Sequence, residues 1–186
     1  GLDPTGSVFP IVPDNNQGGN EVIKDICVNQ DDGSIYAIGY FTEDIFYGTN
    51  YELVNTTNNR AIFVAHYDRC GVLLNAVMYG YDDNDETNLH IEILSNELIA
   101  IAGDFVNTIS FDGGTTDYTS AGGTDVFLAI IDPTTLLVTD PDNVRQLHST
   151  NNDRAKGFTS AGNSVVVTGS FAANGFTDGN TTLTLH

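Results

Sequence analysis

The chain lacks several residue types that would point to particular classes of protein. Its 186 residues include no tryptophan, one methionine, two cysteines and six basic residues. Two cysteines, Cys27 and Cys70, are too few for a disulfide scaffold. No apolar run approaches the roughly 18 residues of a membrane-spanning helix, so we expect no membrane insertion. Six basic residues against 25 acidic ones give a net charge of −19. Nucleic acids and anionic membranes are therefore poor partners, because binding phosphates needs clustered Lys and Arg.

The residues that are abundant indicate a folded, strand-rich domain. The chain is 40% hydrophobic and has 19 glycines, with Thr, Asn and Asp throughout. That mixture is typical of many short strands joined by turns. The length fits one domain with a substantial core. The acidic surface favours solubility and makes cationic partners, calcium among them, plausible.

An internal repeat organises the whole sequence. The segment 39–68 aligns without gaps with 103–132, and a third copy begins at Gly169. The preceding runs SIYAIGYF, LIAIAGDF and SVVVTGSF also match, and their glycines at 39, 103 and 169 are 64 and 66 residues apart. Repeats of this length are typical of solenoids and propellers.

Each repeat is predicted to hold four strands, A to D. Strand A covers 24–30, 88–94 and 155–161. Strand B covers 34–41, 98–105 and 164–171. Strand C covers 61–67 and 125–131. An aspartate turn follows strand C and leads into another apolar run, VLLNAVM at 72–78 or LLVTD at 136–140, and VLLNAVM is interpreted as strand D. Strand C is apolar on both faces, so we expect it to be covered on both sides.

The glycine within strand B calls for an explanation, because a mid-strand glycine weakens a strand. Three equivalent glycines, each followed two residues later by Phe, predict close packing between neighbouring sheets. A second glycine-rich stretch, TSAGG at 119–123, directly precedes strand C. We expect Gly122 and Gly123 to provide backbone freedom at that corner.

The repeat resembles the SBBP-type β-propeller repeat of secreted bacterial proteins. The resemblance rests on GSIYAIGYF, FDGGTTDYTSAGGTDVFLAIID and AIFVAHYDRCGVLLNAV, and TSAGGTDVFLA is its most specific part. The first copy departs from the pattern, with VNTTNNRAIFVA where TSAGG would stand. The resemblance implies an all-β fold of antiparallel four-stranded propeller blades, an extracellular or cell-surface location, and a structural, adhesive or binding role. It does not imply a catalytic site.

The expected organisation is about three repeats with ends that fall inside blades. Residues 1–20 would hold the last strand of a preceding blade and a linker, 21–80 blade 1, 81–146 blade 2 and 147–186 a partial blade 3. Closed propellers have four to eight blades. The sequence is therefore expected to be a segment of a longer propeller. The alternative is a complete subunit whose open edges pair with other copies.

A calcium site is the strongest chemical candidate. The loop YDDNDE, 81–86, brings Asp82, Asp83 and Asp85 together, and calcium binds carboxylate and carbonyl oxygens. The loop lacks the EF-hand spacing, and acidic turns commonly cap their own backbone instead. The stretch SFDGGTT, 110–116, matches most of an Asp-box, which is structural. No other cofactor is indicated.

Three further features concern individual side chains. Asn55 and Asn180 each begin an Asn-Thr-Thr triplet, a glycosylation acceptor pattern, in the connection between strands B and C. Cys27 and Cys70 are expected to remain unpaired, because strands A and C lie two ladder spacings apart. His66 is expected to be a packed residue rather than a ligand.

These observations favour a non-catalytic extracellular repeat domain that serves adhesion, ligand binding or structural assembly. Its expected partners are protein or glycan surfaces and other copies of itself. Two alternatives stay open: a subunit of a filament or lattice joined by strand exchange, and the propeller of an enzyme that acts on polysaccharide.

Overall fold

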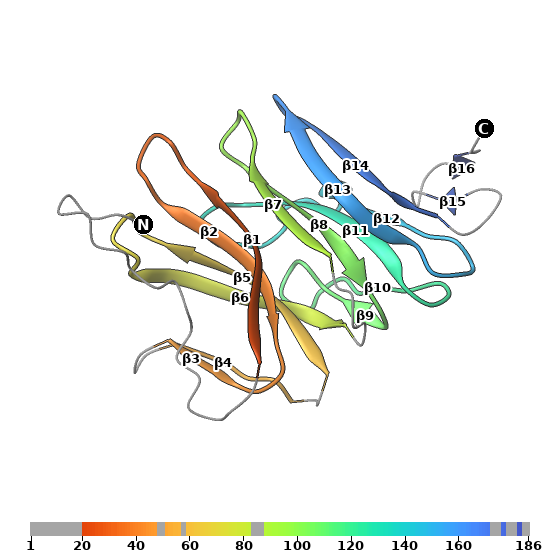
Figure 1. The fold of residues 1–186 in the computed structure, drawn as a ribbon, viewed down its shortest axis with the longest axis horizontal. Coiled ribbons are helices and arrows are strands. Elements are labelled where there is room, and N and C mark those ends of the chain that lie inside the picture. The colour runs from red at the N-terminus through yellow and green to blue at the C-terminus, as the bar shows by residue number, and fades with distance from the viewer. Residues whose placement is uncertain are drawn as a thin grey trace.

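The computed structural model of the chain describes residues 20–47, 51–56, 59–82, 88–171, 176–177 and 182–183. The fold is all-β, and its sheets are antiparallel. Figure 1 shows three hairpins side by side, from β1–β2 through β7–β8 to β13–β14. Within the described ranges, no helix is long and apolar enough to cross a membrane.

Repeat 1, which comprises β1 to β6, contains the four predicted strands. β1 (Glu21–Val28), β2 (Ile35–Phe41), β5 (Arg60–Tyr67) and β6 (Leu73–Asp82) are antiparallel neighbours in that order. Their alternating apolar residues and intervening turns correctly predicted these strands. A small hairpin of β3 (Ile45–Tyr47) and β4 (Tyr51–Leu53) occupies the connection between β2 and β5.

Repeat 2, which comprises β7 to β12, has its outer strand at an unexpected place. β7 (Leu89–Ile93), β8 (Ile99–Phe105) and β11 (Asp125–Ile131) match strands A, B and C, but β12 spans Val144–Leu147 after a 3-10 turn, η1 (Pro141–Asn143). The run at 136–140 forms no strand; the amide of Val138 donates to the carbonyl of Phe111. Leu136 and Val138 enter the core from this irregular segment instead.

Repeat 3 is described through β13 (Arg154–Ala161) and β14 (Ser164–Ser170), together with β15 (Phe176–Thr177) and β16 (Thr182–Leu183). β13 and β14 pair as the third A–B hairpin, as the sequence predicted.

A second hairpin joins successive repeats. β9 (Thr108–Ile109) and β10 (Tyr118–Thr119) belong to repeat 2, yet Ile109 pairs with Gly80 of β6 and so extends the sheet of repeat 1 to six strands. β15 of repeat 3 likewise contacts β12 of repeat 2. The connection between strands B and C thus reaches back to the outer strand of the preceding repeat.

The core lies between the sheets. We name the face that carries the odd-numbered residues of β2, β8 and β14 the odd face, and the opposite one the even face. The even face of repeat 1 packs on the odd face of repeat 2 in a single cluster, with Tyr36 and Ile38 on one side and Ile99, Ile101 and Phe127 on the other. The odd face of repeat 1 forms a second cluster with Ile45 and Leu53. Burial on both faces of β5 and most of β11 is what the sequence predicted.

The in-strand glycines make room for strand A of their own sheet, which corrects the expectation of packing between sheets. A Cβ at Gly39 would lie 2.1 Å from the carbonyl oxygen of Val22, and one at Gly169 would lie 2.0 Å from that of Arg154. In repeats 1 and 3, a β-bulge in strand A directly follows the residue paired with the glycine. The bulge brings the backbone of strand A over the glycine, where a side chain would collide with it.

The glycines of the corner TSAGG likewise provide space for a neighbouring segment rather than conformational freedom. Neither Gly122 nor Gly123 has positive φ. A Cβ at Gly122 would lie 2.6 Å from the carbonyl carbon of Thr150, and one at Gly123 would lie 1.8 Å from Oδ1 of Asn152. These glycines therefore let the segment that enters repeat 3 pass close to the start of β11.

A buried carboxylate joins repeats 2 and 3. Asp104 on β8 accepts hydrogen bonds from the amide of Ala155 on β13 at 2.5 Å and from Nδ2 of Asn88 at 2.8 Å. Burial raises its pKa to about 6, although these hydrogen bonds and the charge of Arg154 act in the opposite direction. The junction therefore holds a carboxyl group that becomes protonated in mildly acidic solution.

The substitution Gly103→Val should destabilise the fold. Its Cβ would lie 2.5 Å from Cδ2 of Leu89 and 2.6 Å from the carbonyl oxygen of Asn88, inside a buried strand. We expect a loss of about 3 kcal/mol in the free energy of unfolding, measured by denaturant titration. Ser170→Val, on an exposed part of β14, is the control and should change it by less than about 0.5 kcal/mol. Equal stability of the Gly103→Val variant and the unsubstituted chain would refute the close-approach explanation.

The stability of the unsubstituted chain relative to Asp104→Asn should depend on pH. Burial raises the pKa of Asp104 from its ordinary value of 3.8 to about 6 in the folded chain, so the folded state binds the proton more tightly. As pH falls from about 7 to about 4, the unsubstituted chain should gain on the order of 2–3 kcal/mol over the variant. The measurement is urea unfolding of both proteins at several pH values. A difference that stays constant with pH would contradict the assigned shift.

Candidate binding site between the first two repeats

A cleft opens between the A–B turns of repeats 1 and 2. Its volume is about 290 Å³. The turn that follows β1 forms one wall, and the end of β7 with its following turn forms the other. The lining residues are Val28, Asn29, Gln30, Asp31, Ile93, Leu94, Ser95 and Glu97.

Local hydrogen bonds fix the shape of both turns. In the first, the amide of Asn29 donates to the carbonyl of Ser34 at 2.9 Å, and the side chain of Asn29 accepts from the amide of Asp31 at 2.9 Å. In the second, the amides of Leu94 and Glu97 donate to the carbonyls of Leu98 and Leu94, respectively. Such closed turns hold the cleft walls in place without contributions from bulky side chains.

The corresponding junction between repeats 2 and 3 is closed. There the amide of Ser95 donates to the carbonyl of Gly162 at 3.2 Å, so the two turns touch. The A–B connection spans residues 29–34 in repeat 1 but only 162–163 in repeat 3. The additional residues in repeat 1 form one wall of the open cleft.

The lining combines apolar and acidic groups. Val28, Ile93 and Leu94 provide apolar contacts, whereas Asp31 and Glu97 provide carboxylates. No Lys or Arg lines the cleft. Hydroxyl and amine groups are suitable donors to carboxylates and amide oxygens, whereas an anionic ligand would be repelled. The cleft therefore suits a neutral polyhydroxylated ligand or a cationic group.

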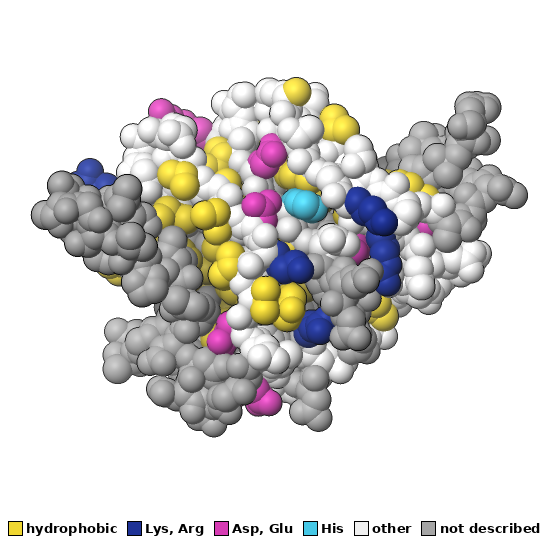
Figure 2. Space-filling view, in the orientation of Figure 1, with side chains coloured by type: hydrophobic (Ala, Val, Ile, Leu, Met, Phe, Trp, Pro, Cys, Tyr) yellow, Lys and Arg dark blue, Asp and Glu magenta, His cyan; other side chains and the backbone are white. Residues whose placement is uncertain are grey.

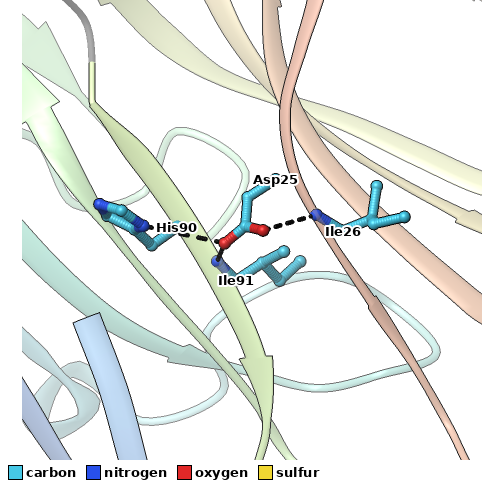
Figure 3. A network of polar contacts seen from close by, with 4 residues as sticks. All are labelled: Asp25, Ile26, His90 and Ile91. Carbon is cyan, nitrogen blue, oxygen red and sulfur yellow. Dashed lines mark hydrogen bonds and ion pairs between the residues drawn. The ribbon is translucent and has the colours of Figure 1, made fainter. Parts of the chain in front are cut away.

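One carboxylate anchors the A strands beside this cleft. Asp25 on β1 accepts hydrogen bonds from the amide of Ile26 at 2.9 Å and from the amide of Ile91 on β7 at 3.1 Å. Its Oδ2 lies 3.8 Å from Nδ1 of His90 (Figure 3). The imidazole of His90 in turn stacks on Phe158 of β13, with ring centroids 6.0 Å apart. Asp25 thus connects β1 to β7, and His90 connects β7 to β13, so the A strands of all three repeats are linked.

A polar row crosses the even face of repeat 1 near the same end. Cys27 pairs with Tyr36, Tyr36 with His66, and His66 with Asn75. The rings of Tyr36 and His66 stack at 4.2 Å, as expected for a packed histidine. Nδ2 of Asn75 donates to the carbonyls of Thr134 and Thr135 in repeat 2. The row therefore ties two repeats together.

The row is uncharged at neutral pH. Burial raises the pKa of the Cys27 thiol to about 12, and the charges of Asp25 and Glu92 add to the effect. Burial also lowers the pKa of His66, although the charge of Asp32 partly opposes it. A thiol that stays protonated is a poor nucleophile. Cys27 and Cys70 are both free, as the strand spacing predicted.

The predicted calcium residues lie mostly outside the described part of the chain. Asp82 ends β6, whereas Asp83 and Asp85 fall outside the described residues. Within the described ranges, no group of three His, Cys, Asp or Glu side chains is placed to hold a metal ion. Calcium binding by this loop stays a prediction.

The two predicted glycosylation sites differ in what the structure shows. Asn180 lies outside the described residues. Nδ2 of Asn55, the atom that would carry a glycan, donates to the carbonyls of Asn59 at 2.8 Å and Phe41 at 3.4 Å. Attaching a glycan in the folded state would require breaking the bond to Asn59 or the weaker one to Phe41.

Several acidic side chains cap turns. Asp112, in the Asp-box-like stretch, accepts from the amides of Thr115 and Thr116 and from the hydroxyl of Ser110. These hydrogen bonds lower the pKa of Asp112 to about 2. Asp32 and Asp140 likewise accept from backbone amides of their own turns. Part of the large negative charge therefore stabilises loops locally.

Sequence reasoning missed both the cleft and the Asp25–His90 contact. Asp25 and His90 occupy the same position in their repeats, because they pair with Ile38 and Ala102, which are 64 residues apart. Aligning the A strands by the strand B residues that they pair with would have shown that Asp25 and His90 occupy equivalent positions.

Comparisons with known proteins identify no relative. No family model, no curated protein and no solved structure matches the chain.

Proposed function

We propose that the chain is a non-catalytic repeat domain of β-propeller type that acts outside the cell or on its surface. Its role would be adhesion, ligand binding or structural assembly. The observation that carries the proposal is the repeated contact of one even face with the next odd face. Repeat 1 packs on repeat 2 through one apolar core, and Asp104 joins repeat 2 to repeat 3 from the even face of β8. Stacked antiparallel sheets of this kind are the building plan of propellers.

The contacts of the polar side chains support a structural role. Asp25, Asp104 and Asn75 bind backbone groups of the neighbouring repeat. His66 and Cys27, which are common catalytic residue types, are packed in an uncharged row. Asp25, Asp104 and Asn75 thus hold repeats together, whereas His66 and Cys27 pack within repeat 1.

We place the ligand in the cleft between repeats 1 and 2. It lies at the rim, where the A–B turns end, and its carboxylates accept hydrogen bonds from hydroxyl groups. Neutral glycans fit this chemistry, because their hydroxyls donate to carboxylates and their C–H faces pack on apolar side chains. We therefore propose a glycan surface as the bound partner at this site.

A binding assay with neutral oligosaccharides tests the proposal. The intact chain should bind members of an immobilised panel of neutral glycans, and the double variant Asp31→Asn, Glu97→Gln should bind at least about tenfold more weakly, because neutral amides are weaker acceptors than carboxylates. The control is Glu52→Gln, Asp117→Asn, which makes the same charge change at exposed positions that do not line the cleft.

The same panel distinguishes a scaffold from an enzyme. Reducing ends are measured after incubation of the soluble glycans with the chain, and we expect none to be released. Release of reducing ends would support the polysaccharide-active alternative. Equal binding by the cleft variant and its control would place the ligand elsewhere.

A further inference from the structure

We propose that a second surface of the chain binds an acidic polysaccharide, whose carboxylate or sulfate groups pair with Lys24 on β1 and Lys156 on β13. These lysines lie in the first half of their strands, whereas the cleft proposed for neutral glycans lies at the ends of β1 and β7. The two sites therefore differ in place and in the charge of their ligand, and each can be tested without the other.

Both lysines of the chain occupy one special position in strand A. Each follows the residue that pairs with the in-strand glycine, Gly39 in repeat 1 and Gly169 in repeat 3, and the pairing register passes over it as the extra residue of a β-bulge. β7 of repeat 2 pairs with β8 without a bulge and carries no lysine. The close approach over the glycine requires an extra residue but no particular side chain. The use of an exposed lysine at both bulges therefore indicates another role.

Two arginines lie near these lysines in the fold. Arg60 begins β5, and Arg154 begins β13 two residues before Lys156. We name Lys24, Arg60, Arg154 and Lys156 the basic strip. They are four of the six basic residues of the chain, and each lies within the first four residues of its strand. Figure 2 shows Lys and Arg side chains in a band on this face of the molecule, over β1 and beside β13.

An aromatic ring holds two members of the basic strip in place. The Nζ atom of Lys24 lies 6.0 Å from the ring centroid of Tyr40, and the guanidinium carbon of Arg60 lies 4.8 Å from it. The ring attracts both cations and so keeps together two charges that repel each other. Each end of the basic strip thus presents a pair of cations, one pair in repeat 1 and the other in repeat 3.

The separation of the two pairs favours a polymer over a small anion. β1 contacts β7, and β7 contacts β13, so two layers of stacking separate Lys24 from Lys156. Stacked sheets lie about 10 Å apart, which places the two lysines roughly 20 Å from each other. A single carboxylate or sulfate cannot contact both lysines over that distance. A chain with repeated anionic groups can contact both.

The charge of the rest of the molecule favours a polymer with widely spaced charges. A net charge of −19 repels polyanions at long range. Double-stranded DNA carries a negative charge about every 1.7 Å along its axis and needs more Lys and Arg contacts than the basic strip provides. An acidic polysaccharide has its charges separated by whole sugar rings. Asp25, beside Lys24, has its charge stabilised by the amides of Ile26 and Ile91, so Lys24 is not needed to balance it.

Salt should affect this binding in two opposite ways. The screening length is about 30 Å at 0.01 M salt, about 10 Å at 0.1 M and about 3 Å at 1 M. At 0.01 M the whole negative charge of the chain repels the ligand, whereas at 0.1 M distant charges are screened and the lysines in contact still attract it. We therefore expect the affinity to be greatest near about 0.1 M salt and to fall towards 1 M.

Biolayer interferometry with immobilised polymers tests the basic strip. The probes are polygalacturonate, which carries carboxylates, and dextran sulfate, which carries sulfates, and the tighter of the two identifies the anionic group. Lys24→Gln and Lys156→Gln should each weaken binding at about 0.1 M NaCl at least about threefold, and the double variant at least about tenfold, since each removes an ion pair. The double variant Lys24→Arg, Lys156→Arg keeps both charges and should retain binding. Arg69→Gln is the control, because it makes the same charge change in the exposed turn after β5.

Several outcomes would overturn the proposal. Equal effects of Arg69→Gln and the lysine substitutions would show that only the overall charge matters. The absence of binding to both polymers at about 0.1 M NaCl, or equally tight binding of a single-stranded oligonucleotide, would also refute an acidic-polysaccharide site. The cleft variant Asp31→Asn, Glu97→Gln should bind the acidic polymers at least as tightly as the unsubstituted chain, so a failure of the cleft proposal is distinguishable from a failure of this one. Melting temperatures of all variants verify folding.

Discussion

The burial of both faces of the central strands is the constraint on which the rest of the structure depends. β5 and β8 expose almost no side chain on either face, so every such sheet needs an apolar neighbour on each side. A single sheet has no neighbours of its own to cover both faces. Stacking the repeats, with the even face of one sheet on the odd face of the next, supplies them. The repeated sequence is then a consequence, because the same two faces must match at every junction.

Polar residues are placed where this stacking leaves backbone groups to satisfy. Asp25 and Asp104 each accept an amide hydrogen bond from strand A of the next repeat. The two carboxylates differ in surroundings, since Asp104 is fully buried and Asp25 is partly exposed. Burying the charged form of Asp104 at the junction between repeats 2 and 3 is energetically costly, and its raised pKa reflects that cost.

The sequence was sufficient to predict strands A to C in repeats 1 and 2 and strands A and B in repeat 3, because alternation and the in-strand glycine are local signals that recur. It was insufficient for β12 and for the β9–β10 hairpin. Leu136 and Val138 form part of an apolar run that resembles a strand, but they lie in an irregular segment and are buried in the core. An apolar run shows that residues are buried, not that they form a strand. β9 and β10 are two residues long, and Ile109 of β9 pairs with Gly80 at the edge of β6, a contact between repeats that local sequence does not indicate. The cleft left no sequence signal, because it depends on how two turns, which begin at Asn29 and Leu94, approach each other.

Positions that obey the repeat are explained by stacking, whereas the departures from it lie at the rim. The A–B turn is longer in repeat 1 than in repeat 3, and that difference opens the cleft at one junction while Ser95 and Gly162 close the other. Strand A carries Asp25, then His90, then Gly157 at one position, so the side chain that reaches across each junction changes along the chain. A scaffold with identical junctions would have identical turns and identical bridging residues. The rim therefore differs from junction to junction, while the packing of one even face on the next odd face recurs.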